Sequence, residues 1–252
     1  MSLSHLAISL LVAGFAAWLV FLKWFPDTFD SLTGGLKLFT TIVLVDLVCG
    51  PLFTLILANP KKSNRELALD LSLVFLIQLG ALGYGLYSVK LARPAVISFE
   101  RDRIAVITET EIDVSDLPNA PTGLQSLPLS GQLKVGIRRA QNEKEFFESV
   151  NLSLDGIEPS LRPSWWLPYT EVLPEVKEKM QPLSAVNWQQ LDADKRHMLE
   201  EAVASSGLPA EQLYFLPLVS KYTQDWIVLL NKNADFVAYA NLNGFDLGES
   251  IK

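Results

Sequence analysis

LFTTIVLVDLVCGPLFTLILA, residues 38–58, and LALDLSLVFLIQLGALGYGLY, residues 67–87, decide the fold of this chain. Each run has about the 20 residues that a helix needs to cross a hydrocarbon core roughly 30 Å thick. Residues 3–22, LSHLAISLLVAGFAAWLVFL, form a third apolar run of similar length. The sequence therefore predicts a transmembrane domain over residues 1–90, with three α-helical spans at about 3–22, 38–58 and 67–87.

The first run also has features of a cleaved signal peptide. Ala13, Ala16 and Ala17 are small residues of the kind found at cleavage sites. The apolar run continues past them to Phe21, however, and no Lys or Arg precedes it. We therefore expect an uncleaved anchor.

Charged residues divide the chain near residue 90. Residues 1–90 carry 6 Lys and Arg and 5 Asp and Glu, whereas residues 91–252 carry 15 and 23. The second part is long enough to form a soluble domain with its own core. Lys61, Lys62 and Arg65 lie between the second and third runs, which favours the cytoplasmic side for that loop. The N-terminus should then be cytoplasmic, and residues 91–252 should lie on the opposite side of the membrane from the cytoplasm.

Asp46 is a carboxylate within the second run, where a charge costs several kcal/mol unless it is neutralised or paired. On a helix, Asp46, Gly50 and Thr54 share one face, and Pro51 beside them lacks a backbone N–H. Gln78 lies at matching depth in the third run, so we expect it to hydrogen-bond Asp46. This face either packs helices of the chain together or contacts a partner's transmembrane helix. A proton relay at Asp46 is the third interpretation.

Strand patterns in residues 91–252 predict an α+β domain with an antiparallel sheet. Alternating apolar residues favour a hairpin at 95–108, a strand at 133–138 and a meander of strands at 212–240. The helical patterns lie between the early hairpin and the late meander. This order is typical of α+β folds rather than regularly alternating α/β folds.

Capping signals predict helices in the same domain. Asn142 is a candidate N-cap with Glu145 at the capping-box position, and a second helix should run from Asn187 to Gly207. A short helix is expected over residues 170–180. The buried side of the first helix is expected to be Phe146, Phe147 and Val150, and the stripe of the second is expected to be Trp188, Leu191, Met198, Leu199, Ala202 and Val203.

Residues that carry catalysis or bind metals are few in this sequence. His5 and His197 are its two histidines and Cys49 is its single cysteine, so we expect no metal site, no disulfide within the chain, no cofactor and no enzymatic activity. The acidic second half argues against binding to nucleic acid, which requires a clustered positive surface.

The segment from Pro163 to Tyr169, PSWWLPY, is the most distinctive one in the second half. Trp165, Trp166 and Tyr169 between prolines could form a rigid aromatic surface for a partner. The alternative is that one Trp fills the core while the other shields a loop.

Several local motifs carry a resemblance to a known family. They are Asp46-Leu-Val-Cys-Gly-Pro-Leu-Phe-Thr54, Tyr84-Gly-Leu-Tyr87, Arg93-Pro94, Phe99-Glu-Arg-Asp-Arg103, Pro168-Tyr169 and Leu216-Pro-Leu218. With three spans followed by a soluble domain, the chain resembles the type IV pilin accessory proteins of the TfpX/TfpZ group in Gram-negative bacteria.

The resemblance implies an inner-membrane chaperone or assembly factor that binds a type IV pilin subunit and supports its stability, presentation or assembly. The domain at 91–252 would be periplasmic, and the partners would be the pilin, membrane lipids and the pilus assembly machinery. We expect the membrane groove to comprise Asp46, Gly50, Pro51, Thr54 and Gln78, and the contact with the pilin head to comprise Trp165, Trp166 and Tyr169. Two alternatives are a periplasmic ligand-binding receptor that signals through its spans and an intramembrane enzyme centred on Asp46.

Overall fold

The structure is a computed structural model that describes residues 2–25, 29–57 and 63–249. The chain divides into two compact units, Met1–Arg93 and Pro94–Lys252. The first unit is helical, and the second contains all the strands found in the described residues.

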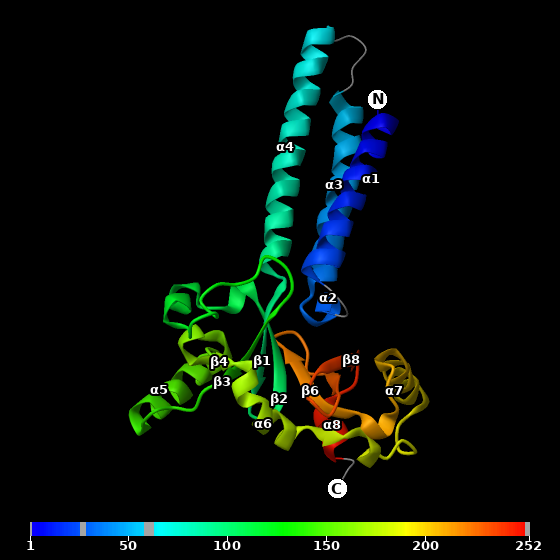
Figure 1. Ribbon diagram of the computed structural model, residues 1–252. Helices are drawn as coiled ribbons and strands as arrows, with labels where there is room; N and C mark the ends of the chain where they lie inside the picture. The colour runs from blue at the N-terminus through cyan, green and yellow to red at the C-terminus, as the bar shows by residue number, and fades with distance from the viewer. Residues whose placement is uncertain (1, 26–28, 58–62, 250–252) are drawn as a thin grey trace. The chain divides into compact units, whose positions relative to one another are not determined.

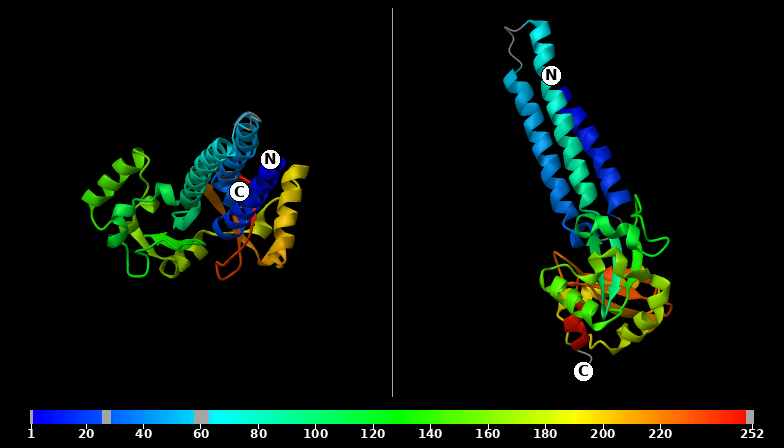
Figure 2. Two further views of the ribbon diagram at one scale, coloured as in Figure 1. Left: turned by 90° about the horizontal axis from the view of Figure 1, so that it is seen from above. Right: turned by 90° about the vertical axis from the view of Figure 1, so that its left-hand side faces the viewer.

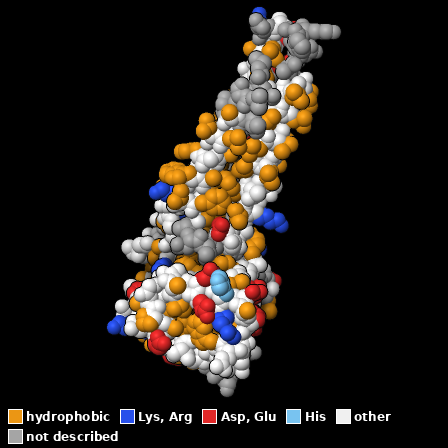
Figure 3. Space-filling model, turned by 90° about the vertical axis from the view of Figure 1, so that its right-hand side faces the viewer, with side chains coloured by type: hydrophobic (Ala, Val, Ile, Leu, Met, Phe, Trp, Pro, Cys, Tyr) orange, Lys and Arg blue, Asp and Glu red, His pale blue; other side chains and the backbone are white. Residues whose placement is uncertain are grey.

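The helical unit consists of long helices packed lengthwise. Its elements are α1 (Ser2–Leu19), the π-helical segment η1 (Val20–Trp24), α2 (Phe29–Leu32), α3 (Gly35–Leu57) and α4 (Asn64–Leu91). Helix α3 contacts both α1 and α4, and the ribbon views show the three helices running side by side (Figures 1 and 2). Hydrophobic side chains cover much of the visible helical surface (Figure 3).

Two described helices, Gly35–Leu57 and Arg65–Leu91, are long and apolar enough to cross a membrane, and they lie close to the predicted second and third spans. Residues 10–24 form a shorter apolar stretch, so a crossing by α1 stays a prediction. Helix α4 begins with a capping box, in which the Oγ of Ser63 accepts from the N–H of Glu66 and the Glu66 carboxylate accepts from the N–H of Ser63. Lys61 and Lys62, on which the predicted orientation depends, lie outside the described residues.

The helical unit has a small core where η1, α3 and α4 meet. Val20, Phe25, Phe39 and Val89 are buried there. Gly85 of α4 belongs to the same contact region, because a Cβ at this position would lie 2.7 Å from Cγ2 of Ile42 on α3. The absence of a side chain therefore sets how closely α3 and α4 approach.

The second unit is built on a mixed sheet whose strands follow the order β4-β3-β1-β2-β6-β7-β8, with β5 paired to β6. The strands are β1 (Pro94–Glu100), β2 (Arg103–Thr108), β3 (Leu133–Ile137), β4 (Trp166–Pro168), β5 (Gln181–Pro182), β6 (Tyr214–Ser220), β7 (Trp226–Leu230) and β8 (Phe236–Ala240). The predicted β1–β2 hairpin and the meander of β6, β7 and β8 are both present and antiparallel.

The prediction of an antiparallel sheet was wrong for the sheet as a whole. Strand β3 pairs parallel to β1, and β6 pairs parallel to β2, so the hairpin is central and the meander extends one side of it. The alternation of apolar residues along a strand identifies the strand but not its neighbour. The long connections before β3 and β6 allow the chain to return to the same end of the sheet, which parallel pairing requires.

The helices of the second unit are α5 (Glu143–Leu154), α6 (Tyr169–Lys179), α7 (Ala193–Ser206) and α8 (Gly244–Glu249). Short 3₁₀ turns connect the elements: η2 (Glu109–Glu111), η3 (Val114–Asn119), η4 (Pro159–Leu161), η5 (Pro163–Trp165), η6 (Leu183–Ala185) and η7 (Ala210–Gln212). Helices α5 and α7 lie on opposite sides of this unit (Figures 1 and 2).

Helix α7 starts later than the sequence predicted. Asn187 caps only a single turn, accepting from the N–H of Gln189 at 3.2 Å. Asp192 then caps the helix by accepting from the N–H of Lys195 at 2.8 Å. Two capping residues close together compete for the start, and the second one begins the continuous helix. The predicted end is confirmed, because Gly207 has the left-handed conformation with φ of 67°.

Among the described residues, two hydrophobic clusters of the second unit lie toward opposite ends of the strand order. The first joins α7 to the meander through residues that include Leu199, Ala202, Phe215, Ile227 and Leu229. The second lies around the hairpin and β3 and includes Val96, Ile107, Val135 and Trp166. The second cluster supports the polar site described below.

Candidate functional site

An aromatic ring in contact with two arginines forms the centre of a polar site in the second unit. Trp165 ends η5 and is 7% exposed. The guanidinium Cζ atoms of Arg138 and Arg162 each lie 4.4 Å from the centroid of its ring. Such cation–π contacts are stronger when they are shielded from water. The two arginines therefore hold the indole in place.

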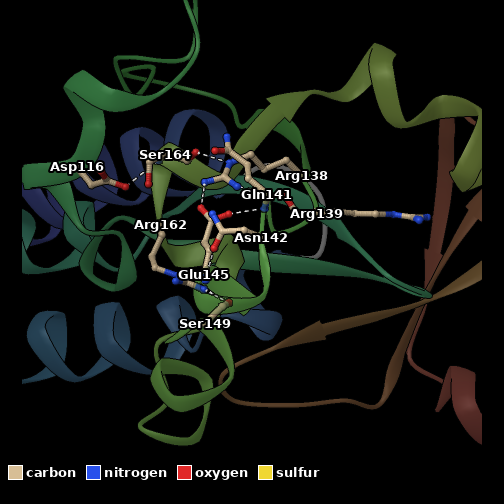
Figure 4. Close-up of polar contacts among 9 residues, drawn as sticks. All are labelled: Asp116, Arg138, Arg139, Gln141, Asn142, Glu145, Ser149, Arg162 and Ser164. Atoms are coloured by element: carbon tan, nitrogen blue, oxygen red, sulfur yellow. Dashed lines mark hydrogen bonds and ion pairs between the residues drawn. The ribbon is translucent and has the colours of Figure 1, made fainter. Parts of the chain in front are cut away.

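Arg138 follows β3 and connects the sheet to α5. Its Nε donates to the carbonyl of Ser164 at 3.0 Å, and its Nη2 donates to Oε1 of Glu145 at 2.6 Å (Figure 4). The other carboxylate oxygen of Glu145 accepts from the backbone N–H of Gln141. Asn142 caps α5 as predicted, since its side chain accepts from the N–H of Glu145 at 2.9 Å. The Glu145 carboxylate, however, binds Arg138 and Gln141 instead of closing a capping box.

Arg162 makes a second connection to the same helix. Its Nη2 donates to Oγ of Ser149 in α5, and Ser149 is 7% exposed (Figure 4). The Nε of Arg162 is buried and has no hydrogen-bond partner among the described residues. Burial lowers the pKa of Arg162, and the nearby carboxylates of Glu100 and Glu158 act in the opposite direction. The guanidinium is therefore held by its contact with the Trp165 ring and by its hydrogen bond to Ser149.

Glu100, at the end of β1, is the acidic group most affected by this environment. Burial raises its pKa above the usual value of 4.5, a hydrogen bond from Ser160 lowers it, and the neighbouring carboxylate of Glu158 raises it. A carboxyl group whose pKa is higher in the folded state favours folding when protonated. Its contribution is therefore fully present below the unfolded-state pKa and is lost as the pH rises through the folded-state pKa.

We expect Glu100→Gln to flatten the pH dependence of stability just above pH 4.5. The amide mimics the protonated carboxyl group, so the variant should lose less stability than wild type as the pH rises toward neutrality. Urea midpoints of the purified full chain at several pH values measure this effect. Glu148→Gln, on the exposed side of α5, is the matched control. Identical pH curves for wild type and Glu100→Gln would contradict the assignment.

The predicted membrane groove is only partly accessible. Gly50 and Thr54 are buried within the helical unit, and Oγ1 of Thr54 donates to the carbonyl of Gly50 at 2.9 Å. Asp46 and Pro51 are half-buried on the continuous helix α3. This burial agrees with the interpretation that Gly50 and Thr54 pack helices together.

The amide nitrogen of Gln78 does not donate to Asp46, while a bond donated by a protonated Asp46 to the amide oxygen of Gln78 stays a prediction. Its Nε2 is buried and donates no hydrogen bond to any described residue, Asp46 included. The bond was expected because Asp46 and Gln78 lie at similar depths, and depth describes only the position of a residue along its helix axis. The rotation of each helix about its axis also decides whether two side chains meet.

The structure buries the aromatic segment that was expected to be a surface. Trp166 is fully buried, and its Nε1 donates to the carbonyl of Ser160 at 2.8 Å. Trp165 is covered by its two arginines, and Tyr169 is half-buried with its hydroxyl 3.4 Å from the carbonyl of Ala234. The exposed aromatic surface is therefore not present, and the alternative interpretation of core filling and shielding fits Trp166 and Trp165.

Sequence reasoning missed Arg138 and Arg162, and it placed the apolar side of α5 in the core. Phe146 and Phe147 are 53% and 63% exposed. The sequence does place arginines near the tryptophan-rich segment, which could have indicated a contact. That contact with Trp165, however, forms only when the sheet is folded. Among the described residues, no group of three or more His, Cys, Asp or Glu side chains is placed to hold a metal ion.

Two apolar helices long enough to span a membrane, followed by a domain with a mixed sheet, are consistent with a membrane-associated protein. Residues 1–34 match the family model of the fimbrial assembly protein FimB. The chain is 35% identical to the serogroup I fimbrial assembly protein of Dichelobacter nodosus, over 96% of this chain and 94% of that protein. It therefore belongs to the fimbrial assembly protein family, which confirms the resemblance to type IV pilus accessory proteins.

Two further Dichelobacter nodosus proteins agree with this assignment. The serogroup E1 fimbrial assembly protein is 34% identical over 96% of this chain and 94% of its own length. The protein of serogroups C1 and C2 is 42% identical over 46% of this chain and 88% of its own length. No solved structure matches the chain.

Proposed function

We propose that this chain is an accessory protein of the bacterial inner membrane that binds a type IV pilin subunit and supports its stability, presentation or assembly into pili. The observation that carries the proposal is the 35% identity to a fimbrial assembly protein over 96% of the chain. A role in pilus assembly follows from the family, and direct binding of a pilin is the further step that we propose.

The character of the helical unit supports a partner within the membrane. The outward faces of α3 and α4 carry large apolar side chains, such as Leu55 and Ile56, which are 67% and 66% exposed. These faces suit lipid tails and an apolar helix equally well. Half-buried Asp46 adds a polar group, which inside a membrane stabilises contacts with other polar groups by about 1 kcal/mol.

The proposed orientation has a cytoplasmic N-terminus and a periplasmic second unit. Lys61 and Lys62 precede α4 in the sequence and Arg65 lies in its first turn, and basic residues at the end of a span favour the cytoplasmic side. Helix α4 has 28 residues, which exceeds the length needed to cross the hydrocarbon core. It leads directly into β1 at Pro94, so one crossing carries the chain to the periplasmic side.

Co-purification from the native host tests whether a pilin binds. Cells are crosslinked, membranes are dissolved in detergent, and captured proteins are identified by mass spectrometry for wild type, Asp46→Ala and Val45→Ala. Val45 is the control because it is the neighbouring residue on α3 and is 56% exposed. We expect the major pilin to be captured, and the yield to fall about threefold or more with Asp46→Ala alone.

The remaining outcomes distinguish whether a pilin binds at all from whether Asp46 is part of the contact. Equal capture by all three proteins would keep the pilin as partner and remove Asp46 from the contact. Folded wild-type protein that captures no pilin would overturn the proposed function.

A ligand-binding receptor is the second candidate, and one observation favours it. The second unit has an open cavity of about 930 Å³ whose lining includes Glu100, Arg103, Thr110, Glu111, Asp113 and Lys221. Pockets of this size with a few converging polar groups are typical of ligand sites. Failure to capture a pilin, together with a rise in melting temperature on adding small charged ligands, would favour this candidate.

A further inference from the structure

Helix α5 exposes the apolar face that an amphipathic helix normally buries. Phe146, Val150 and Leu154 are four residues apart and are 53%, 38% and 82% exposed. Phe147 is 63% exposed and packs edge-on against Phe146, with 5.6 Å between ring centroids. The apolar stripe of a helix usually faces the core of its own domain. Here the described residues leave it uncovered.

Polar contacts on the other side fix α5 in place. Glu145 is bound by Arg138 and Ser149 is bound by Arg162, so the two arginines that enclose Trp165 also hold the helix (Figure 4). The helix therefore does not need its apolar face for attachment. A rigid helix with a free apolar face loses little conformational freedom when a partner binds, which favours recognition.

A groove lies beside this face. Its volume is about 940 Å³, and its apolar lining includes Phe99, Ile137 and Trp165 together with Phe147, Val150 and Leu154. Aromatic and aliphatic side chains next to a concave surface are typical of the centre of a protein–protein interface.

The charges around α5 indicate the chemistry of the occupant. Glu143 and Glu158 line the groove, Glu148 and Asp155 are exposed on and just after α5, and Lys144 is the single lysine in the segment 141–160. Three arginines also line the groove: Arg101, Arg138 and Arg139. Arg101 interacts electrostatically with Glu100, and Arg138 is bound to Glu145. Arg139 points away from the cluster, and its Nη2 lies 3.6 Å from Oε1 of Glu175 (Figure 4). A partner with Lys or Arg beside its apolar side chains would complement this acidic rim.

The same charges disfavour two other occupants. Residues 94–252 carry 23 Asp and Glu against 14 Lys and Arg. A second copy of this chain would bring one acidic rim against another, and anionic lipid headgroups would meet the same repulsion.

We infer that α5 and the groove beside it, which we call the α5 surface, bind a basic and apolar segment on the soluble head of the pilin subunit. This inference rests on the proposed function and adds the place and the chemistry of the contact. The α5 surface provides the apolar centre, and its acidic rim attracts Lys or Arg of the head.

Binding measurements with the purified soluble head of the host's major pilin test the inference. The protein is the full chain in detergent, and the variants are Phe147→Ser with Leu154→Ser, Glu148→Lys, and the controls Met198→Ser and Glu200→Lys on α7. Met198 is 39% exposed and Glu200 is exposed, so each control makes the same kind of change on a helix at the other side of the unit. Circular dichroism confirms that each variant is folded.

We expect the double variant to bind the head about tenfold more weakly or worse, and Glu148→Lys about threefold more weakly. Added salt should weaken binding by wild type more than binding by Glu148→Lys, because salt screens the attraction. Unchanged binding by the double variant, or an equal loss from the two controls, would overturn the inference.

Capture of intact pilin from the host separates this inference from the proposed function. Equal capture by wild type and the double variant would remove the α5 surface while leaving the pilin as partner. Reduced capture by the double variant alone would support the inference, and no capture by wild type would overturn both.

Discussion

Trp166→Ala is expected to lower the free energy of unfolding of the second unit by about 3–5 kcal/mol, the usual cost of removing a buried tryptophan. The side chain is fully buried in the cluster that contains Val96, Ile107 and Val135. Its removal leaves a cavity and also leaves the carbonyl of Ser160 without the indole N–H. Since whole domains are stable by only about 5–15 kcal/mol, this is a large fraction of the total.

Pulse proteolysis of the detergent-solubilised full chain over a range of urea concentrations measures this loss. Trp166→Phe retains a ring but not the hydrogen bond to Ser160, so its urea midpoint should lie between those of wild type and Trp166→Ala. Tyr222→Ala is the control, because Tyr222 is 59% exposed and its removal should change stability by less than about 0.5 kcal/mol. A midpoint for Trp166→Ala equal to that of Tyr222→Ala would show that the indole is not part of the core.

Gly85→Leu is expected to separate α3 from α4 and to reduce severalfold the amount of protein in the membrane. A Cβ at residue 85 would lie 2.7 Å from Cγ2 and 3.2 Å from Cδ1 of Ile42. Ile42 is β-branched and has few rotamers with which to move away. Overpacking of this kind costs about 1–3 kcal/mol or more, enough to change cellular abundance several-fold.

Gly83→Leu is the matched control, because nothing lies within 4 Å of a Cβ at that position. Immunoblots of membrane fractions should show Gly83→Leu near the wild-type level and Gly85→Leu well below it. Ile42→Ala should partly restore the level of Gly85→Leu by making room for the added side chain. Equal losses from Gly83→Leu and Gly85→Leu would show that contact with Ile42 does not decide the outcome, since Leu favours a helix more than Gly at both positions.

Local signals in the sequence predicted the parts of the fold that depend on neighbouring residues. The β1–β2 hairpin, the final meander and the Asn142 cap each involve residues close together in the chain. The order of the strands could not be predicted in the same way. The parallel pairing of β2 with β6 joins residues such as Ile104 and Leu218, and nothing local specifies that choice.

The site was harder to predict than the fold. A pair of tryptophans between prolines has the same sequence pattern whether the rings are exposed or enclosed. The deciding contacts come from Arg138 after β3 and Arg162 before η5, which meet at Trp165 only in the folded unit. For α5, periodicity identified the apolar face correctly, but periodicity does not reveal whether the domain covers that face.

The parallel contact between β2 and β6 has a consequence for the order of synthesis. The ribosome completes β2 at Thr108 but reaches β6 only at Tyr214, roughly one hundred residues later. At 5–20 residues per second, the hairpin waits roughly 5–20 s with one long edge unpaired. During that interval the nascent chain exposes the unpaired edge of β2, which can pair with a strand of another chain. Misassembly is therefore a risk while residues 109–213 are being synthesised.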